Sequence, residues 1–178
     1  MPRPKKTAGE LNGPGTLQRF AETAETVAAT TKKLEKAALL GAYFRELSDD
    51  DLARAARYFA GQQFALRDAR TTNVGGGVLR DALSEVTGLD VENLRPRYVR
   101  LGDSGDMAYE VFLETKAANL RPTLTLAATE QFVELLSGTR GTKSKKALVV
   151  EALRNATPLE AKYLVKLLTG DLRIGLKE

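Results

Sequence analysis

The sequence predicts an all-α fold, an irregular multi-helix bundle of roughly eight to twelve helices. Three observations support this prediction: apolar residues recur three and four positions apart, glycine follows several such segments, and alternating strand patterns are nearly absent. The chain has 178 residues, 43% of them hydrophobic and 28% charged, which is typical of one folded domain. We therefore expect a single core built by helices.

The first part of the chain divides into a leader and two helices. Residues 1–15 hold prolines, basic residues and a Gly-Pro-Gly sequence, so we expect a flexible basic leader there and a helical domain over residues 16–178. Apolar positions from Leu17 to Ala28 share one face of a first helix. Those from Leu34 to Leu47 continue the period and predict a second.

The next two helices have recognisable ends. Ser48 precedes three aspartates, which places an N-cap oxygen and three carboxylates at a helix start, and Gly61 is suited to its end. After a loop, the apolar positions from Val78 to Val86 predict a fourth helix that ends at Gly88.

The middle of the chain gives a weaker pattern. Pro96 lies within residues 94–101, where we expect it to break or start a helix. Apolar residues between Met107 and Phe112 predict a short helix that follows.

Three helices are expected in the last part. The first has Thr125 as a cap and Gly138 as its end, and the second holds apolar positions from Leu148 to Leu153. The third begins at residues 157–160 (TPLE), which supply a capping threonine, a proline at the first helical position and the reciprocal glutamate. This is the sharpest local signal in the sequence.

Composition excludes several classes of chemistry. The chain has no Cys and no His, so disulfides, zinc fingers and imidazole catalysis are excluded from it. No P-loop, dinucleotide fingerprint or nucleophile elbow occurs, and no catalytic or metal-binding residues are predicted. Without an apolar stretch that could serve as a secretory signal or membrane span, we expect a cytoplasmic protein. The net charge of +4 is compatible with nucleic-acid binding but does not establish it.

A basic loop precedes the second of the three last helices. Lysines in a first helical turn face the positive end of the helix dipole, which is unfavourable unless an anion occupies the site. The loop is therefore a candidate phosphate clamp, and a solvated loop is an equally plausible interpretation. Its candidate residues are Arg140, Gly141, Thr142, Lys143, Ser144, Lys145 and Lys146.

Three consecutive glycines, Gly75, Gly76 and Gly77, stand at the entrance of another helix. Each is worse than alanine by roughly 1 kcal/mol if helical. Close approach of a DNA backbone to free amides would explain them. A tight left-handed turn, which the residues alone favour, or packing against another helix would also explain them.

A third candidate lies in residues 171–176, where apolar residues alternate around Arg173. Arg173 is a candidate groove or phosphate contact, but on the residues alone an ion pair with Asp171 or with a neighbouring helix is the favoured interpretation. The five tyrosines are scattered and lie mostly on apolar faces, which indicates core residues and not platforms for stacked bases.

Several of these segments, in this order, resemble the N-terminal DNA-binding domain of ATP-dependent DNA ligases. The E-A-K-Y helix followed by G-D-L-R-I-G-L is the most specific of them. The resemblance covers about residues 17–178, and its motifs are residues 34–36 (LEK), 73–79 (NVGGGVL), 87–90 (TGLD), 102–106 (GDSGD), 138–146, 160–164 (EAKYL) and 170–176 (GDLRIGL).

The resemblance implies a helical domain that grips the minor groove of nicked duplex DNA through backbone phosphates, with little sequence preference. It places DNA contacts at Gly75 to Gly77, at Arg140 to Lys146, and at Arg173 and Gly175. Where the family usually shows Leu-Gly-Val-Gly, this chain has residues 72–77 (TNVGGG), so the motif does not say which glycine amide meets the phosphate.

The resemblance also implies a longer parent enzyme. ATP-dependent nick sealing, through enzyme-AMP and DNA-adenylate intermediates, would belong to a nucleotidyltransferase domain with a K-x-D-G motif, which is absent from this sequence. ATP and Mg²⁺ are expected for that parent, with no cofactor in this segment. Nicked double-stranded DNA and the downstream nucleotidyltransferase domain are the expected partners of a nucleoid-associated monomer in replication, repair or recombination.

Two other classes of function are consistent with a helical chain. A helical protein-interaction scaffold predicts no DNA affinity, and the sequence shows no repeat period at 34 to 47 residues. A helix-turn-helix regulator predicts a strong preference for one DNA sequence.

Overall fold

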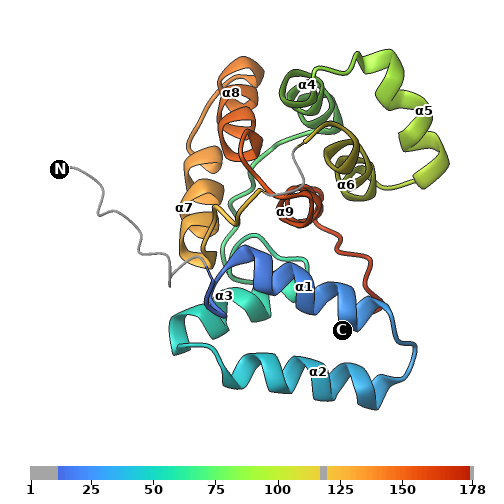
Figure 1. Cartoon of the computed structure of the whole chain (residues 1–178). Helices are drawn as coiled ribbons and strands as arrows, with labels where there is room; N and C mark the ends of the chain where they lie inside the picture. Colours follow the sequence, from blue (N-terminus) through green and yellow to red (C-terminus); the bar gives the residue numbers. More distant parts are fainter. Residues whose placement is uncertain (1–11, 117–119, 177–178) are drawn as a thin grey trace.

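The computed structural model describes residues 12–116 and 120–176. Within these ranges it contains nine α-helices and no β-strand, which confirms the all-α class and the expected number of helices (Figure 1). An isolated bridge joins Thr16 to Thr125. The helices are α1 (Leu17–Ala28), α2 (Lys33–Arg45), α3 (Asp49–Phe59), α4 (Gly76–Thr87), α5 (Val91–Leu101), α6 (Ser104–Thr115), α7 (Leu126–Ser137), α8 (Thr142–Leu153) and α9 (Pro158–Thr169).

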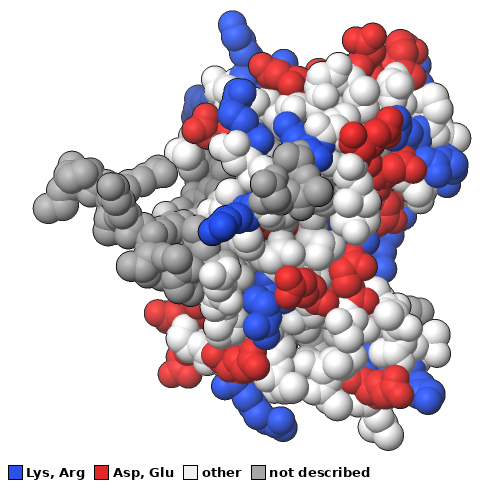
Figure 2. Space-filling view, in the orientation of Figure 1, with Lys and Arg blue, Asp and Glu red and all other residues white. Residues whose placement is uncertain are grey.

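The surface carries charges of both signs. Figure 2 shows lysines, arginines and acidic residues intermingled on one face, with no large area of a single sign. On α5, Arg97 pairs with Glu114 at 2.5 Å and Arg100 with Glu110 at 2.5 Å, so many charges are locally compensated. An anion site on this surface must therefore be sought at individual cations that have no acidic partner, and not at a broad basic area.

Helix α9 lies at the centre of the molecule, where Figure 1 shows it nearly end-on between α1 and α6. Eight of its residues are buried, including the run from Tyr163 to Leu168. A helix that is buried on all sides belongs to the core and does not lie on the surface. The remaining helices are arranged around it.

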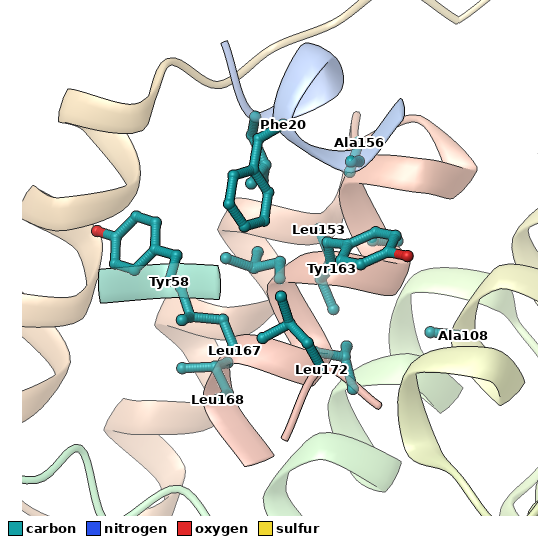
Figure 3. Close-up of a cluster of buried hydrophobic side chains, with 14 of the residues drawn as sticks. Phe20, Tyr58, Ala108, Leu153, Ala156, Tyr163, Leu167, Leu168 and Leu172 are labelled. Atoms are coloured by element: carbon teal, nitrogen blue, oxygen red, sulfur yellow. The ribbon is translucent and has the colours of Figure 1, made fainter. Parts of the chain in front are cut away.

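Aromatic and leucine side chains fill the space between α9, α1 and α3 (Figure 3). The ring of Phe20 lies 6.2 Å from that of Tyr58 and 6.3 Å from that of Tyr163, both edge-on, a favourable geometry for aromatic pairs. Burial raises the pKa of the Tyr58 phenol to about 12, because the low-dielectric core disfavours the phenolate. The tyrosines in this cluster are core residues, as predicted.

Helix α6 packs closely on α9, and residues 102–106 make this possible. A Cβ at Gly105 would lie 2.7 Å from the Lys162 carbonyl oxygen, so only glycine fits here. The buried Lys166 ammonium lies 3.1 Å from the Asp103 carboxylate and 3.3 Å from that of Asp106. This segment, which the resemblance singled out, therefore joins two core helices.

The capping box at the start of α9 is confirmed, and its glutamate does more than cap. Glu160 is fully buried and accepts hydrogen bonds from the Thr157 amide at 3.0 Å and from the Thr123 and Leu124 amides at 2.9 Å. One carboxylate thus holds the entry to α9 and the segment that leads into α7.

The segment before α1 is hydrogen-bonded to the start of α7 and to α2. The Leu126 amide donates to the Gly15 carbonyl at 2.8 Å, and the Tyr43 hydroxyl donates to the Pro14 carbonyl at 3.0 Å. Of the expected leader, residues 1–11 lie outside the described residues, whereas Pro14 and Gly15 contact the fold.

Most of the expected helix ends are confirmed. Ser48 accepts a hydrogen bond from the Asp51 amide at 3.2 Å, and Thr125 accepts one from Ala128 at 3.0 Å. Gly61 and Gly88 adopt positive φ, 75° and 74°, after α3 and α4, where a side chain would be strained. These signals are local in the chain, so sequence alone sufficed.

The expectation for Pro96 was wrong. Helix α5 runs through it from Val91 to Leu101 and ends before Gly102, which has φ 68°. A proline removes the N–H that would bond the carbonyl of Glu92, four residues earlier. Glu92 and Pro96 are exposed, so water can satisfy that carbonyl.

Replacement of Glu160 by alanine should lower the free energy of unfolding by about 3 kcal/mol or more, because buried amides lose their acceptor. Urea denaturation followed by circular dichroism measures this. Glu160→Gln keeps one acceptor oxygen and should lose less. The exposed Glu151→Ala variant on α8 is the control, with an expected change within about 0.5 kcal/mol. Equal stability of the two alanine variants would contradict the assigned role of Glu160.

Candidate nucleic-acid interface

The structure brings together the two helix entrances that the sequence singled out. Helices α4 and α8 pack against each other (Figure 1). The ammonium of Lys145, in the first turns of α8, donates to the Thr72 carbonyl at 2.7 Å. Thr72 lies three residues before Gly75, the N-cap of α4. The glycine run and the basic loop are therefore neighbours.

The three glycines are not required by the protein's own packing. Gly75 has φ −82°, and neither Gly76 nor Gly77 adopts positive φ. A Cβ at Gly75 or Gly76 would have nothing within 4 Å, and one at Gly77 would meet only the Arg80 guanidinium at 4.0 Å. These findings contradict the tight-turn and helix-packing explanations. What remains is a surface without side chains, open to a partner.

The start of α4 is electrostatically incomplete. No side chain caps it, and its first turn carries no acidic residue. The first amide N–H groups of a helix have no partner within the helix and carry partial positive charge. Because Gly75, Gly76 and Gly77 are exposed, these amides can be approached from solvent.

The start of α8 also lacks a side-chain cap and an acidic residue, and it carries cations in addition. Gly141, its N-cap, has φ 88°, no side chain caps it, and no acid lies in the first turn. Thr142 and Lys143 are exposed there, and Arg140 and Ser144 are exposed on either side of them. The glycine is explained by its positive φ, and no acidic residue in the described ranges pairs with Lys143.

Two of the four cations in the loop have partners within the protein. Lys145 is only 8% exposed, and its ammonium binds the buried Thr72 carbonyl. Lys146 lies 3.4 Å from Glu85 of α4 and stays partly exposed. Arg140 and Lys143 are the cations of this loop whose side chains have neither an ion pair nor a hydrogen bond within the described part of the chain.

Sequence reasoning missed Arg80 as part of this surface. Its guanidinium lies near Gly77, it is about two-fifths exposed, and its nearest acid is Asp81 at 3.6 Å. The available signal was spacing, because residues three and four apart on a helix share a face. Arg80 thus adds a cation to the glycine run.

The structure places Arg173 and Gly175 in a different setting. Arg173 donates to the Gly102 carbonyl at 2.7 Å and lies 3.4 Å from Asp171 and 3.6 Å from Asp103. Its contacts are those of the favoured ion-pair interpretation. It also has φ 51°, which its hydrogen bond to Asp171 helps to hold.

Gly175 belongs to a clamp on the C-terminal segment. The buried Lys36 ammonium donates to the Ile174 carbonyl at 2.8 Å and to the Val27 carbonyl at 3.0 Å. A Cβ at Gly175, which has φ 72°, would lie 2.8 Å from that nitrogen. Lys36 of the 34–36 motif and Gly175 of the 170–176 motif therefore have structural explanations.

The described ranges hold neither a candidate metal site nor a candidate membrane-spanning helix. No group of three or more acidic side chains there is placed to hold a metal ion. In the same ranges, no helix has the length and apolarity that crossing a bilayer requires.

These features define an all-α domain with two open helix entrances beside exposed cations. Residues 16–178 match a family model described as DNA ligase N terminus. The chain belongs to this family, as the sequence motifs predicted.

Curated relatives carry corresponding names. The chain is 37% identical to a probable DNA ligase of Koribacter versatilis over 162 residues, which is 91% of this chain and 28% of the relative. It is 35% identical to a probable DNA ligase of Opitutus terrae, over 96% of this chain and 20% of that protein. A DNA ligase 1 of Methanosarcina mazei shares 29% identity, over 89% of this chain and 27% of its own length. The chain thus spans less than a third of each of these relatives.

The burial of Lys145 predicts a contrast with Lys143. Lys145→Ala should lower the free energy of unfolding by about 1–3 kcal/mol, since the Thr72 carbonyl loses its donor. Lys145→Met, which keeps most of the apolar stem, separates the hydrogen bond from packing. The exposed Lys143→Ala should change stability by less than about 0.5 kcal/mol, as measured by urea denaturation. If Lys145→Ala is as stable as Lys143→Ala, the assigned contact is wrong.

Proposed function

We propose that this domain binds nicked duplex DNA without sequence preference, through backbone phosphates along the minor groove. It would position the nick for sealing by a nucleotidyltransferase domain of the same polypeptide. The observation that carries the proposal is the pair of uncapped helix entrances joined by Lys145, beside three glycines that the fold itself does not require.

The chemistry of the two entrances suits phosphate. A helix N-terminus presents amide donors and a positive dipole to an anion. Glycines let a sugar-phosphate backbone approach those amides closely. Arg140, Lys143 and Arg80 add charge that has little or no compensation in the described structure. Such contacts carry no base information, which is why we propose sequence independence.

For the parent enzyme we propose ATP-dependent joining that uses Mg²⁺. The relatives named as DNA ligases support a ligase parent. We assign no catalytic residue to this chain, which has no K-x-D-G motif. Its contribution would be grip and orientation, because holding both sides of a break in place makes the later reaction effectively unimolecular. One monomer per nick is the stoichiometry that we propose.

The first test is DNA binding by fluorescence anisotropy with nicked duplexes of unrelated sequence. We expect similar affinities for all of them and a steep fall with salt, about 0.9 log units per log unit of salt for each phosphate neutralised. No binding would favour a protein-interaction scaffold, and a strong preference for one sequence would favour a helix-turn-helix regulator. Either result contradicts the proposal.

A second test removes the unpaired cations of the basic loop. Arg140→Ala combined with Lys143→Ala should weaken binding and reduce the salt slope by about two phosphates' worth, roughly 1.8. Lys145 is left intact, so the fold is preserved. The matched control is Lys33→Ala combined with Arg45→Ala on α2, which removes the same charge from exposed positions on a different helix. Equal losses in both double variants would indicate a net-charge effect and contradict a phosphate site in the loop.

A third test uses the glycine run. Gly76→Ala and Gly76→Leu occupy open space, so thermal stability should stay the same or rise, by up to about 1 kcal/mol. DNA affinity should fall in both, more in the leucine variant, by roughly tenfold if one amide-phosphate bond is lost. Unchanged affinity of Gly76→Leu would remove this entrance from the interface.

A further inference from the structure

A pocket of about 280 Å³ lies beside the glycine run, between α4, α5 and the start of α6. Figure 1 shows these three helices together at one end of the molecule. Leu94 and Met107 are buried and give the pocket an apolar floor. Arg80, Arg95, Tyr98 and Ser104 supply its polar and aromatic lining. An apolar floor with a few convergent polar groups is the usual composition of a ligand site.

The arginines of α5 differ in their partners, and this difference points to a ligand. Arg97 and Arg100 pair with acidic residues of α6. Arg95, on the same helix, has neither an ion pair nor a hydrogen bond from its side chain within residues 12–116 and 120–176, and it is the one that lines the pocket. Its charge is available to an anion.

Arg80 gives a second, independent indication. Its side chain is 41% exposed and forms no hydrogen bond among the described residues, the nearest carboxylate oxygen being 3.6 Å away on Asp81. A guanidinium carries five N–H donors in a planar fork that suits the oxygens of a phosphate. An acceptor supplied from outside the protein would satisfy this side chain.

We infer that this pocket holds one deoxynucleotide unit of the strand that passes the glycine run. Its phosphate would pair with Arg80 and Arg95, and its sugar would lie against the exposed Tyr98 ring. Gly76 lines both the pocket and the α4 entrance, so one strand can reach both. The inference rests on the proposed function and extends it, because it adds a phosphate and a sugar contact on α5.

The test is a scan of neutral methylphosphonate linkages, one per duplex, along the strand next to the nick. The proteins are the unaltered chain, Arg95→Ala and Arg100→Ala, and anisotropy gives the affinities. Arg100 is the matched control, because it has the same charge on the same helix but pairs with Glu110 and does not line the pocket. Circular dichroism checks that each variant is folded.

For Arg95→Ala we expect a roughly tenfold loss of affinity for the unmodified duplex. At one linkage, methylphosphonate should weaken the unaltered chain and Arg100→Ala but cause no further loss in Arg95→Ala, which couples that phosphate to Arg95. Tyr98→Ala should weaken binding with an unchanged salt slope, because the sugar contact carries no charge.

The outcomes separate this inference from the proposed function. If the unaltered chain binds the duplex but Arg95→Ala behaves as Arg100→Ala at every linkage, the pocket assignment is overturned and the phosphate sites at the helix entrances stand. If AMP alone displaces the duplex from the unaltered chain but not from Arg95→Ala, the pocket holds a free nucleotide and the inference is also overturned. No binding to the duplex by the unaltered chain overturns the proposed function, and this inference with it.

Discussion

The fold depends on the burial of α9 by the helices around it. A buried charged group is costly unless it is paired, so the charged side chains of this helix need partners from neighbouring segments. Glu160, at the start of the helix, accepts from three backbone amides. Lys166, near its end, lies between the carboxylates of Asp103 and Asp106. The two charges thus do more than avoid a penalty: each specifies which segment lies beside that end of α9. Leucines and tyrosines alone would fill the same volume with less directional preference.

This central arrangement determines where the candidate interface can form. Helix α6 is fixed on α9 through Gly105 and the Lys166 pairs, and α4 packs on α6 and α8. The hydrogen bond from Lys145 to the Thr72 carbonyl then fixes the α8 entrance beside the segment that leads into α4. A basic loop therefore contains cations with two different tasks. The Lys145 ammonium joins the two helix entrances, whereas Arg140 and Lys143 carry charge that no acidic residue in the described ranges pairs.

Features that depend on a few consecutive residues could be predicted from the sequence. The capping residues Ser48, Thr125 and Thr157 act on amides within three positions, so their patterns are complete in the sequence. Lys145 could not be assigned, because in the sequence a lysine at a helix start looks the same whether its ammonium is free or bonded. Only the packing of α4 on α8, which brings Lys145 to the Thr72 carbonyl, distinguishes the two cases. For Arg173 the sequence was sufficient, because its ion-pair partner Asp171 lies only two residues away in the chain.

The Lys36 clamp has a mechanical consequence. One ammonium joins the end of α1, its own helix α2 and the segment after α9, through Val27 and Ile174. Tension on the C-terminal segment would therefore be carried into the first two helices and would not simply peel the segment away. A joint of this kind couples the direction of the C-terminal segment to that of the α1–α2 pair.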